Sequence, residues 1–211
     1  MKLQFLAQYD AATSLSAPGW EDDEISSFIN KATKDIITEL YNKKELVHLS
    51  NLILTKTNLA LTTATGITNA SYCDIHSYSY LYFLTGRLKL TRTVSPIITV
   101  GEYIPSEEID ETVAPKFFQT AFNKVWFRYP KCYLRTPFVN PNGFTYSTLM
   151  FLYDSYTTPL YGEFTYISVP VSVDIAGGVD SNMNEVLHKD IIDKAVEEAV
   201  KSIKVAKITN Q

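Results

Sequence analysis

Cys73 and His76 stand in a C-x2-H spacing beside Asp74, and thiolate, imidazole and carboxylate groups are the usual protein ligands of zinc. A structural zinc site needs four ligands, which normally come from two such closely spaced pairs. The other candidates are scattered along the chain and unpaired: His48, Cys132 and His188. The sequence therefore predicts no metal site, and we expect Cys73 and His76 to be partly buried strand residues.

Catalytic patterns are also missing from the sequence. The phosphate-binding patterns G-x-x-x-x-G-K-[ST] and G-x-G-x-x-G do not occur, and Gly177-Gly178 is typical of a turn that enters a helix. The serine-hydrolase turn G-x-S-x-G is absent too. His188 and Asp190 lie at the start of a predicted helix, where such residues usually cap the helix or face solvent. The two catalytic carboxylates of a glycosidase can come from any two points of a chain, so the sequence does not exclude glycosidase chemistry. We expect no enzymatic activity and no cofactor.

Arg87, Lys89 and Arg92 form the one basic stripe of the sequence, interleaved with leucines on a predicted strand. They are candidates for an interface or a DNA channel, because their cations could contact phosphates or the acidic patch of a neighbouring subunit. The alternative is the solvated face of a strand, with a lysine that guards a sheet edge. A run of tyrosines precedes the stripe and favours sheet filling over a base-stacking platform: Tyr78, Tyr80 and Tyr82.

The composition is that of an ordinary globular protein, with 45% hydrophobic and 20% charged residues. A net charge of −4 argues against a general nucleic-acid binder, whose surface would be basic, although DNA could pass close by without being gripped. Two cysteines cannot form a disulfide framework, and the N-terminal residues do not resemble a secretory signal. No stretch approaches roughly 18 apolar residues, so we expect no membrane partner and assembly in the cytoplasm.

Helical patterns stand near both ends of the chain. Apolar residues recur at helical spacing over residues 22–42, and four acids at 21–24 favour a helix start there. A second amphipathic helix is predicted over residues 186–205. Residues 1–20 indicate an extended arm that could order on assembly. The apolar positions that we expect to act as assembly elements include Phe28, Ile36, Ile192 and Val196.

The middle of the chain, residues 72–174, is rich in aromatic residues, threonine and turn signals, and predicts β-structure. Thr85-Gly86 indicates a tight hairpin turn, and residues 140–143 (Asn-Pro-Asn-Gly) the clearest turn of all. We expect one α+β domain over residues 1–211. Its N-terminal and C-terminal amphipathic helices should pack against a central, mainly antiparallel β-sheet or small sandwich.

Four stretches, in order along nearly the whole chain, resemble the head–tail connector or ring (adaptor) proteins of crAss-like podoviruses, which are tailed bacteriophages. The first joins residues 17–25 (APGWEDDEI) to 28–32 (FINKA), and the second is residues 80–92 (YLYFLTGRLKLTR). The others are residues 122–124 (FNK) with 127–130 (FRYP), and residues 163–170 (EFTYISVP) with 187–196 (LHKDIIDKAV).

The resemblance implies a structural virion protein of the phage neck or tail. Such a protein forms a closed ring, commonly a dodecamer with twelvefold symmetry, stacked between the portal and the tail. Double-stranded DNA passes through the channel without sequence-specific binding, and the portal and other connector or tail proteins are the partners. Localisation in the virion, after assembly in the host cytoplasm, is also implied.

Three alternatives stay open at this point. The aromatic residues would also suit a carbohydrate- or receptor-binding β module of a phage tail fibre. An enzyme of unrecognised type is another reading, and a minor capsid or tail protein at a different position in the particle is the third.

Overall fold

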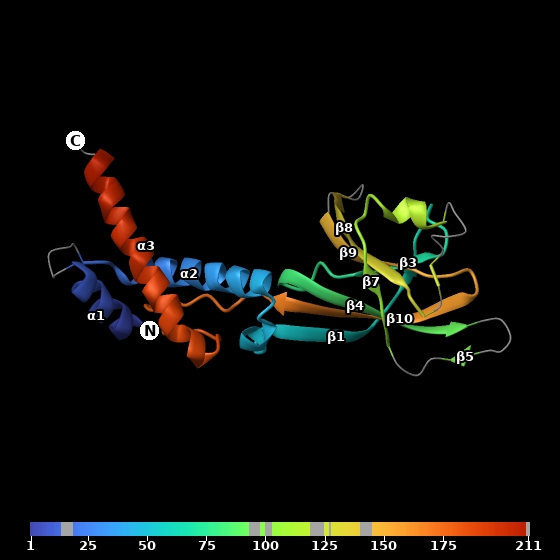
Figure 1. Ribbon diagram of the computed structural model, residues 1–211, viewed down its shortest axis with the longest axis horizontal. Coiled ribbons are helices and arrows are strands. Elements are labelled where there is room, and N and C mark those ends of the chain that lie inside the picture. Colours follow the sequence, from blue (N-terminus) through green and yellow to red (C-terminus); the bar gives the residue numbers. More distant parts are fainter. Residues whose placement is uncertain are drawn as a thin grey trace. The chain divides into compact units, whose positions relative to one another are not determined.

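The chain divides into two compact units that do not follow the order of the sequence. The structure is a computed structural model that describes residues 1–13, 19–92, 98–99, 103–118, 125–126, 128–139 and 145–209. A helical unit combines residues 1–52 with 169–211, and a β unit comprises residues 53–168 (Figure 1). The α+β class with helices near both ends and a mainly antiparallel β region is confirmed. Each of the two units has its own buried residues, and the single domain over residues 1–211 stays a prediction.

The helical unit contains three α-helices within the described residues: α1 (Lys2–Thr13), α2 (Asp22–Lys43) and α3 (His188–Thr209). Two short 3-10 helices, η1 (Leu46–Leu49) and η4 (Glu185–Leu187), flank α2 and α3. Helix α3 packs on both α1 and α2. The apolar faces of the helices are buried within the helical unit, where each helix packs on another helix.

The prediction of an extended arm over residues 1–20 is wrong, because residues 2–13 form α1. Phe5 and Tyr9 lie one helical turn apart and are 0% and 2% exposed. Their rings stack at 6.0 Å, and Phe5 also stacks on Phe28 of α2 at 6.4 Å. Aromatic burial therefore anchors this helix. Residues 14–18 lie outside the described part of the chain.

The predicted helices at 22–42 and 186–205 are confirmed as α2 and α3, with the second shifted toward the C-terminus. At the start of α2 the backbone N–H of Glu21 donates to the Glu24 carboxylate at 2.9 Å, which is one half of a capping box. At its end Lys44 adopts a left-handed conformation with φ 60°, and its N–H donates to the Tyr41 carbonyl at 3.0 Å.

Asn30 of α2 holds the extended segment that follows the β unit. Its side-chain oxygen accepts from the Val173 N–H at 2.7 Å, and its side-chain nitrogen donates to the Val173 carbonyl at 2.9 Å. One turn earlier, the Ser26 hydroxyl accepts from the Ile175 N–H at 3.1 Å. The backbone of this segment is thus satisfied by helix side chains in place of a neighbouring strand.

The β unit forms two five-stranded sheets from its described residues. The first sheet has the order β1-β10-β4-β5, and β6 also pairs with β4. Its strands are β1 (Ile53–Leu59), β4 (Tyr80–Arg92), β5 (Ile98–Thr99), β6 (Ile104–Pro105) and β10 (Thr157–Ser168). The second sheet has the order β2-β3-β9-β8-β7. Its strands are β2 (Thr62–Thr63), β3 (Ala70–Asp74), β7 (Glu107–Glu108), β8 (Lys131–Val139) and β9 (Thr145–Leu152). β7 and β8 pair in parallel, whereas the other strand pairs of the described residues are antiparallel.

The β region therefore begins near residue 53, earlier than the predicted start at 72, and ends at 168 rather than 174. One hydrophobic cluster draws buried residues from both sheets, so the unit is a sandwich. A second cluster lies under the 3-10 helix η2 (Ala114–Phe118), which contributes Ala114 to it. The predicted turn at 140–143 lies outside the described residues, between the antiparallel strands β8 and β9.

The predicted hairpin at Thr85-Gly86 is wrong, because β4 runs straight through both residues. Gly86 is needed for a different reason. A Cβ placed there would lie 3.1 Å from the Cys132 sulfur and 3.2 Å from Phe151 of the opposite sheet. Gly162 on β10 faces Phe151 in the same way, at 3.1 Å. The two glycines let the Phe151 ring, which is 0% exposed, approach the first sheet closely.

Cys73 and Cys132 are free thiols buried in this sandwich, 2% and 0% exposed. Burial raises the pKa of each thiol from 9.0 to about 12. Since the thiolate is the reactive form, we expect neither cysteine to react with a maleimide in the native protein and both to react on unfolding. Labelling over a urea series, read by mass spectrometry, measures this. Labelling of native protein at the rate of free cysteine would contradict the burial.

The same shifts give a pH dependence with a defined sign. Above about pH 9 the unfolded chain loses thiol protons that the folded chain retains until about pH 12, so the unfolded state binds fewer protons. We therefore expect the free energy of unfolding to fall as the pH rises through this window. Urea unfolding at pH 8 and pH 10 measures the change, and a Cys73→Ala/Cys132→Ala variant should show a smaller pH dependence than the parent protein.

Candidate functional site

The residues of the C-x2-H pattern are not brought together. Cys73 is buried in the sandwich, whereas His76 is exposed and its Nδ1 lies 2.6 Å from the Asp74 carboxylate. This pair closes a local turn, because the same carboxylate accepts the backbone N–H of His76 at 2.9 Å. Among the described residues, no group of three or more His, Cys, Asp or Glu side chains is placed to hold a metal ion.

Arg87 and Lys89 of the basic stripe lie on β4, on the face of the first sheet that points away from the sandwich core. Leu88 and Leu90 are 0% exposed on the inner face, and Arg87 and Lys89 alternate with them on the outer one. Arg87 is held by Glu163 of β10, with Nη1 and Oε1 3.2 Å apart. Glu163 is only 5% exposed. The side chain of Arg92 lies outside the described part of the structure.

Arg87 therefore has a structural role, whatever else it binds. Replacing it with alanine would leave the buried Glu163 carboxylate without its cation. We expect Arg87→Ala to lower the free energy of unfolding by about 1–3 kcal/mol, as measured by urea unfolding. The same change in a Glu163→Gln background should cost less, and Lys89→Ala, on the same strand face, should change stability by no more than about 0.5 kcal/mol. Equal losses for Arg87→Ala in both backgrounds would exclude the pairing as the cause.

The four residues expected to act as assembly elements are all covered within the chain itself. Ile36, Ile192 and Val196 are 6%, 0% and 6% exposed. Phe28 is partly buried and its ring contacts Trp20 edge-on at 5.1 Å. The reason is that α2 and α3 use their apolar faces to pack on each other. Ile36, Ile192 and Val196 therefore belong to the core of the helical unit, and a role of the four residues in assembly stays a prediction.

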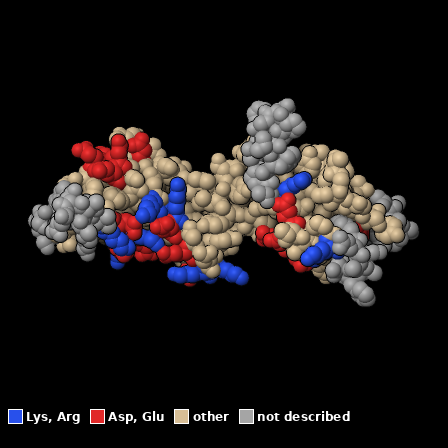
Figure 2. All heavy atoms as spheres, turned by 90° about the horizontal axis from the view of Figure 1, so that it is seen from above, with Lys and Arg blue, Asp and Glu red and all other residues tan. Residues whose placement is uncertain are grey.

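Charged residues border the seam between α2 and α3. Lys31 of α2 pairs with Glu198 of α3, and Lys194 of α3 pairs with Glu39 of α2. The hydrogen bond from Lys194 lowers the pKa of Glu39, and that from Lys31 lowers the pKa of Glu198. Figure 2 shows charged side chains of both signs gathered over the helical unit. Exposed pairs of this kind add little stability, so their effect is to favour one alignment of the two helices.

Among the described residues of the helical unit, three large apolar side chains are more than two thirds exposed. Leu3 on α1 is 82% exposed, Val47 on η1 is 82% exposed, and Val186 on η4 is 69% exposed. We call these residues the exposed apolar set. Large apolar side chains left in water are the residues that protein contacts would cover.

An exposed aromatic turn stands at the start of β8 in the β unit. Trp126 and Tyr129 are 63% and 60% exposed, and their rings stack at 6.0 Å with an interplanar angle of 18°. The Tyr129 N–H donates to the Trp126 carbonyl at 2.8 Å, which closes the turn. Tryptophan and tyrosine are enriched where proteins bind other molecules, because their rings offer a large area at low entropic cost.

Sequence reasoning missed several of these residues. For the exposed aromatic turn, the only signal in the sequence is the density of aromatic residues before Pro130. Glu163 could not be identified as the partner of Arg87, because 76 positions separate them. Nothing in the sequence marks Asn30 as a residue that binds another segment, because polar residues are ordinary in an amphipathic helix.

Within the described residues, no helix is both long enough and apolar enough to cross a membrane. No protein-family model matches this sequence, and no curated protein matches it either.

Proposed function

We propose that this chain is a structural subunit of a tailed-phage particle, which assembles into a ring in the head–tail connector or tail. In this role it performs no catalysis. Its partners are further copies of itself, the portal and other connector or tail proteins. The ring encloses the channel through which double-stranded DNA passes. The ordered resemblance of four sequence stretches to connector and ring proteins of crAss-like podoviruses supports the proposal.

The exposed apolar set is the observation that carries the proposal. The helical unit closes its own core, and nevertheless Leu3, Val47 and Val186 remain 69% to 82% exposed. A ring requires head-to-tail contacts, in which one surface of each copy meets a different surface of the next. Apolar side chains on separate elements of the unit would suit two such surfaces.

The charges favour a channel through which DNA slides rather than sticks. The net charge is −4, and Arg87 of the basic stripe is already paired with Glu163. Gripping DNA requires many unpaired cations facing the phosphates. In this proposal the basic stripe of Arg87, Lys89 and Arg92 therefore contacts DNA phosphates only to a limited extent. Lys89 and Arg92 supply the cations, because Arg87 is paired with Glu163.

Light scattering of the purified protein, fractionated by size, tests the self-assembly. We expect a discrete mass that is a whole multiple of the chain, and we expect Leu3→Ser or Val186→Ser to shift the protein toward monomer without loss of helix content. Thr38→Ser, a polar change on α2, is the control and should leave the mass unaltered. A stable monomer at all concentrations, from a protein that is also absent from virions, would contradict the proposal.

The aromatic turn favours a second function, that of a carbohydrate- or receptor-binding β module of a tail fibre. Sugar rings stack on exposed aromatic faces, and Trp126 and Tyr129 present two of them. A glycan array separates this function from the first. Binding that Trp126→Ala abolishes and that Tyr156→Ala, an exposed tyrosine elsewhere on the β unit, leaves intact would favour the binding module. No glycan binding at all would leave ring assembly as the better account.

A further inference from the structure

Val47 stands on a fixed turn that follows α2. Its side chain is 82% exposed on η1. The turn is anchored by Leu49, which is 1% exposed, and the Ser50 N–H donates to the Val47 carbonyl at 3.3 Å. A large apolar side chain that a fixed turn holds in water is a candidate contact residue.

A pocket of about 510 Å³ lies between the start of α1 and the segment that follows the β unit. Its apolar lining includes Leu3, Val173, Ile175 and Val179. Leu3 and Val179 are 82% and 40% exposed, so the pocket leaves apolar surface in water. Asn30 holds the backbone of Val173 through two hydrogen bonds, so this wall of the pocket is fixed before a partner binds.

A single chain does not bring Val47 into its own pocket. Lys2, which also lines the pocket beside Leu3, pairs with Asp22 at the first residue of α2, whereas Val47 follows the last residue, Lys43. The 22 residues of α2 span roughly 33 Å at a rise of about 1.5 Å per residue. A second copy can supply the valine, and such a contact joins two different surfaces, as a head-to-tail ring requires.

The charges around the two surfaces are opposite in sign. Asp174 and Asp180 line the pocket, and neither forms an ion pair within the described residues. Close before Val47 in the sequence, Lys43 and Lys44 are exposed, and Glu45 offsets only one of their two charges. Complementary charge of this kind steers two surfaces together and suppresses the wrong pairing.

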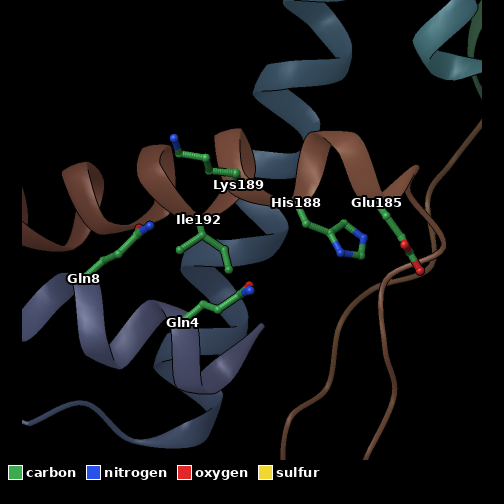
Figure 3. Close-up of a pocket in the computed structure, with 6 residues that line it drawn as sticks. All are labelled: Gln4, Gln8, Glu185, His188, Lys189 and Ile192. Carbon is green, nitrogen blue, oxygen red and sulfur yellow. The ribbon is translucent and has the colours of Figure 1, made fainter.

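A second pocket, between α1 and the start of α3, suits a valine less well. Figure 3 shows polar side chains around this space, including Gln4 and Gln8 from α1 and His188 from α3. Oε1 of Gln8 and Nε2 of His188 are buried and have no hydrogen-bond partner within the described residues. A valine could pair with neither atom, whereas water could pair with each. The pocket lined by Leu3 and Val179 is therefore the better match.

We propose that Val47 of one copy inserts into the pocket lined by Leu3, Val173, Ile175 and Val179 of the next copy. The lysines before Val47 then face the acidic rim of that pocket. This inference rests on the proposed ring and names the two surfaces that meet in it.

Disulfide linking between copies tests the contact. Chains with Val47→Cys, mixed with chains with Val179→Cys and mildly oxidised, should give a linked dimer, and a chain with both changes should give a ladder of linked oligomers. Each single variant alone should give no linked species, because Cys73 and Cys132 are buried. Glu185→Cys in place of Val179→Cys is the matched control, because it puts the second thiol at the polar pocket, and it should not link.

Light scattering of the same samples separates this contact from the ring itself. Assembly that persists without a link between positions 47 and 179, or with a link to position 185 instead, would overturn the contact and leave the ring proposal standing. Monomers in every sample would overturn both.

Substitutions without oxidation give an independent readout. Val47→Ser should weaken association by about tenfold and leave the circular dichroism unchanged, because it removes apolar atoms outside the core. Lys44→Glu should weaken association too, and Asp180→Lys added to it should restore association. If Asp180→Lys weakened association further, the proposed match of charges would be wrong.

Discussion

Ile192→Ala is expected to lower the free energy of unfolding of the helical unit by about 2–5 kcal/mol. The side chain is 0% exposed and lies on the face of α3 that also buries Ile191 and Ala195. Removing its outer carbon atoms would leave a cavity where α3 packs on its neighbouring helices. Urea unfolding followed by far-UV circular dichroism, which reports mainly the helices, measures the loss.

Val186→Ala is the matched control, because it also removes apolar carbon atoms from the helical unit but at a position that is 69% exposed. It should change the free energy of unfolding by no more than about 0.5 kcal/mol and should weaken self-association instead. If Ile192→Ala left stability intact and Val186→Ala reduced it, the assignment of Ile192 to the core of the helical unit would be wrong.

Phe151→Ala is expected to lower the free energy of unfolding of the β unit by about 3–5 kcal/mol. The Phe151 ring is 0% exposed and fills the space that Gly86 and Gly162 leave on the opposite sheet. Neither glycine can supply side-chain atoms to fill the cavity, so the site cannot collapse easily. Maleimide labelling of Cys73 and Cys132 over a urea series follows this unit specifically, because both thiols lie in the same cluster as Phe151.

Two further variants separate packing from other causes. Tyr156→Ala removes an aromatic ring that is 55% exposed and should have a much smaller effect. Gly86→Val adds side-chain atoms where a Cβ alone would lie 3.1 Å from the Cys132 sulfur, so it should cost about 1–3 kcal/mol through overpacking. A Phe151→Ala loss no larger than that of Tyr156→Ala would show that the two sheets do not pack through this ring.

The helices could be predicted from sequence to the extent that they are amphipathic. α2 and α3 carry apolar residues at helical spacing over many turns, and both were found. α1 was missed because Gln4, Gln8 and small residues interrupt its pattern, leaving Phe5 and Tyr9 as its buried residues. Which surface would cover the helices could not be predicted, since an apolar face packs equally well on a helix or a sheet.

The β unit shows a different limit of sequence reasoning. The sequence around Gly86 indicates a turn, yet the role of this glycine depends on Phe151 and Cys132, which approach it only in the folded sandwich. The pairing of Arg87 with Glu163 likewise depends on the register of β4 with β10. Long-range contacts of this kind leave no local pattern in the sequence. Arg87 could therefore be identified as a candidate interface residue, but its partner Glu163 could not.

Averaged cryo-EM maps of the neck and tail of the virion test the ring assignment most directly. We expect a closed ring of this chain between portal and tail, commonly twelvefold, with Leu3, Val47 or Val186 covered by neighbouring chains. Ile192 should remain inside each subunit. Maps in which every ring between portal and tail is built from other chains would rule out the proposed ring.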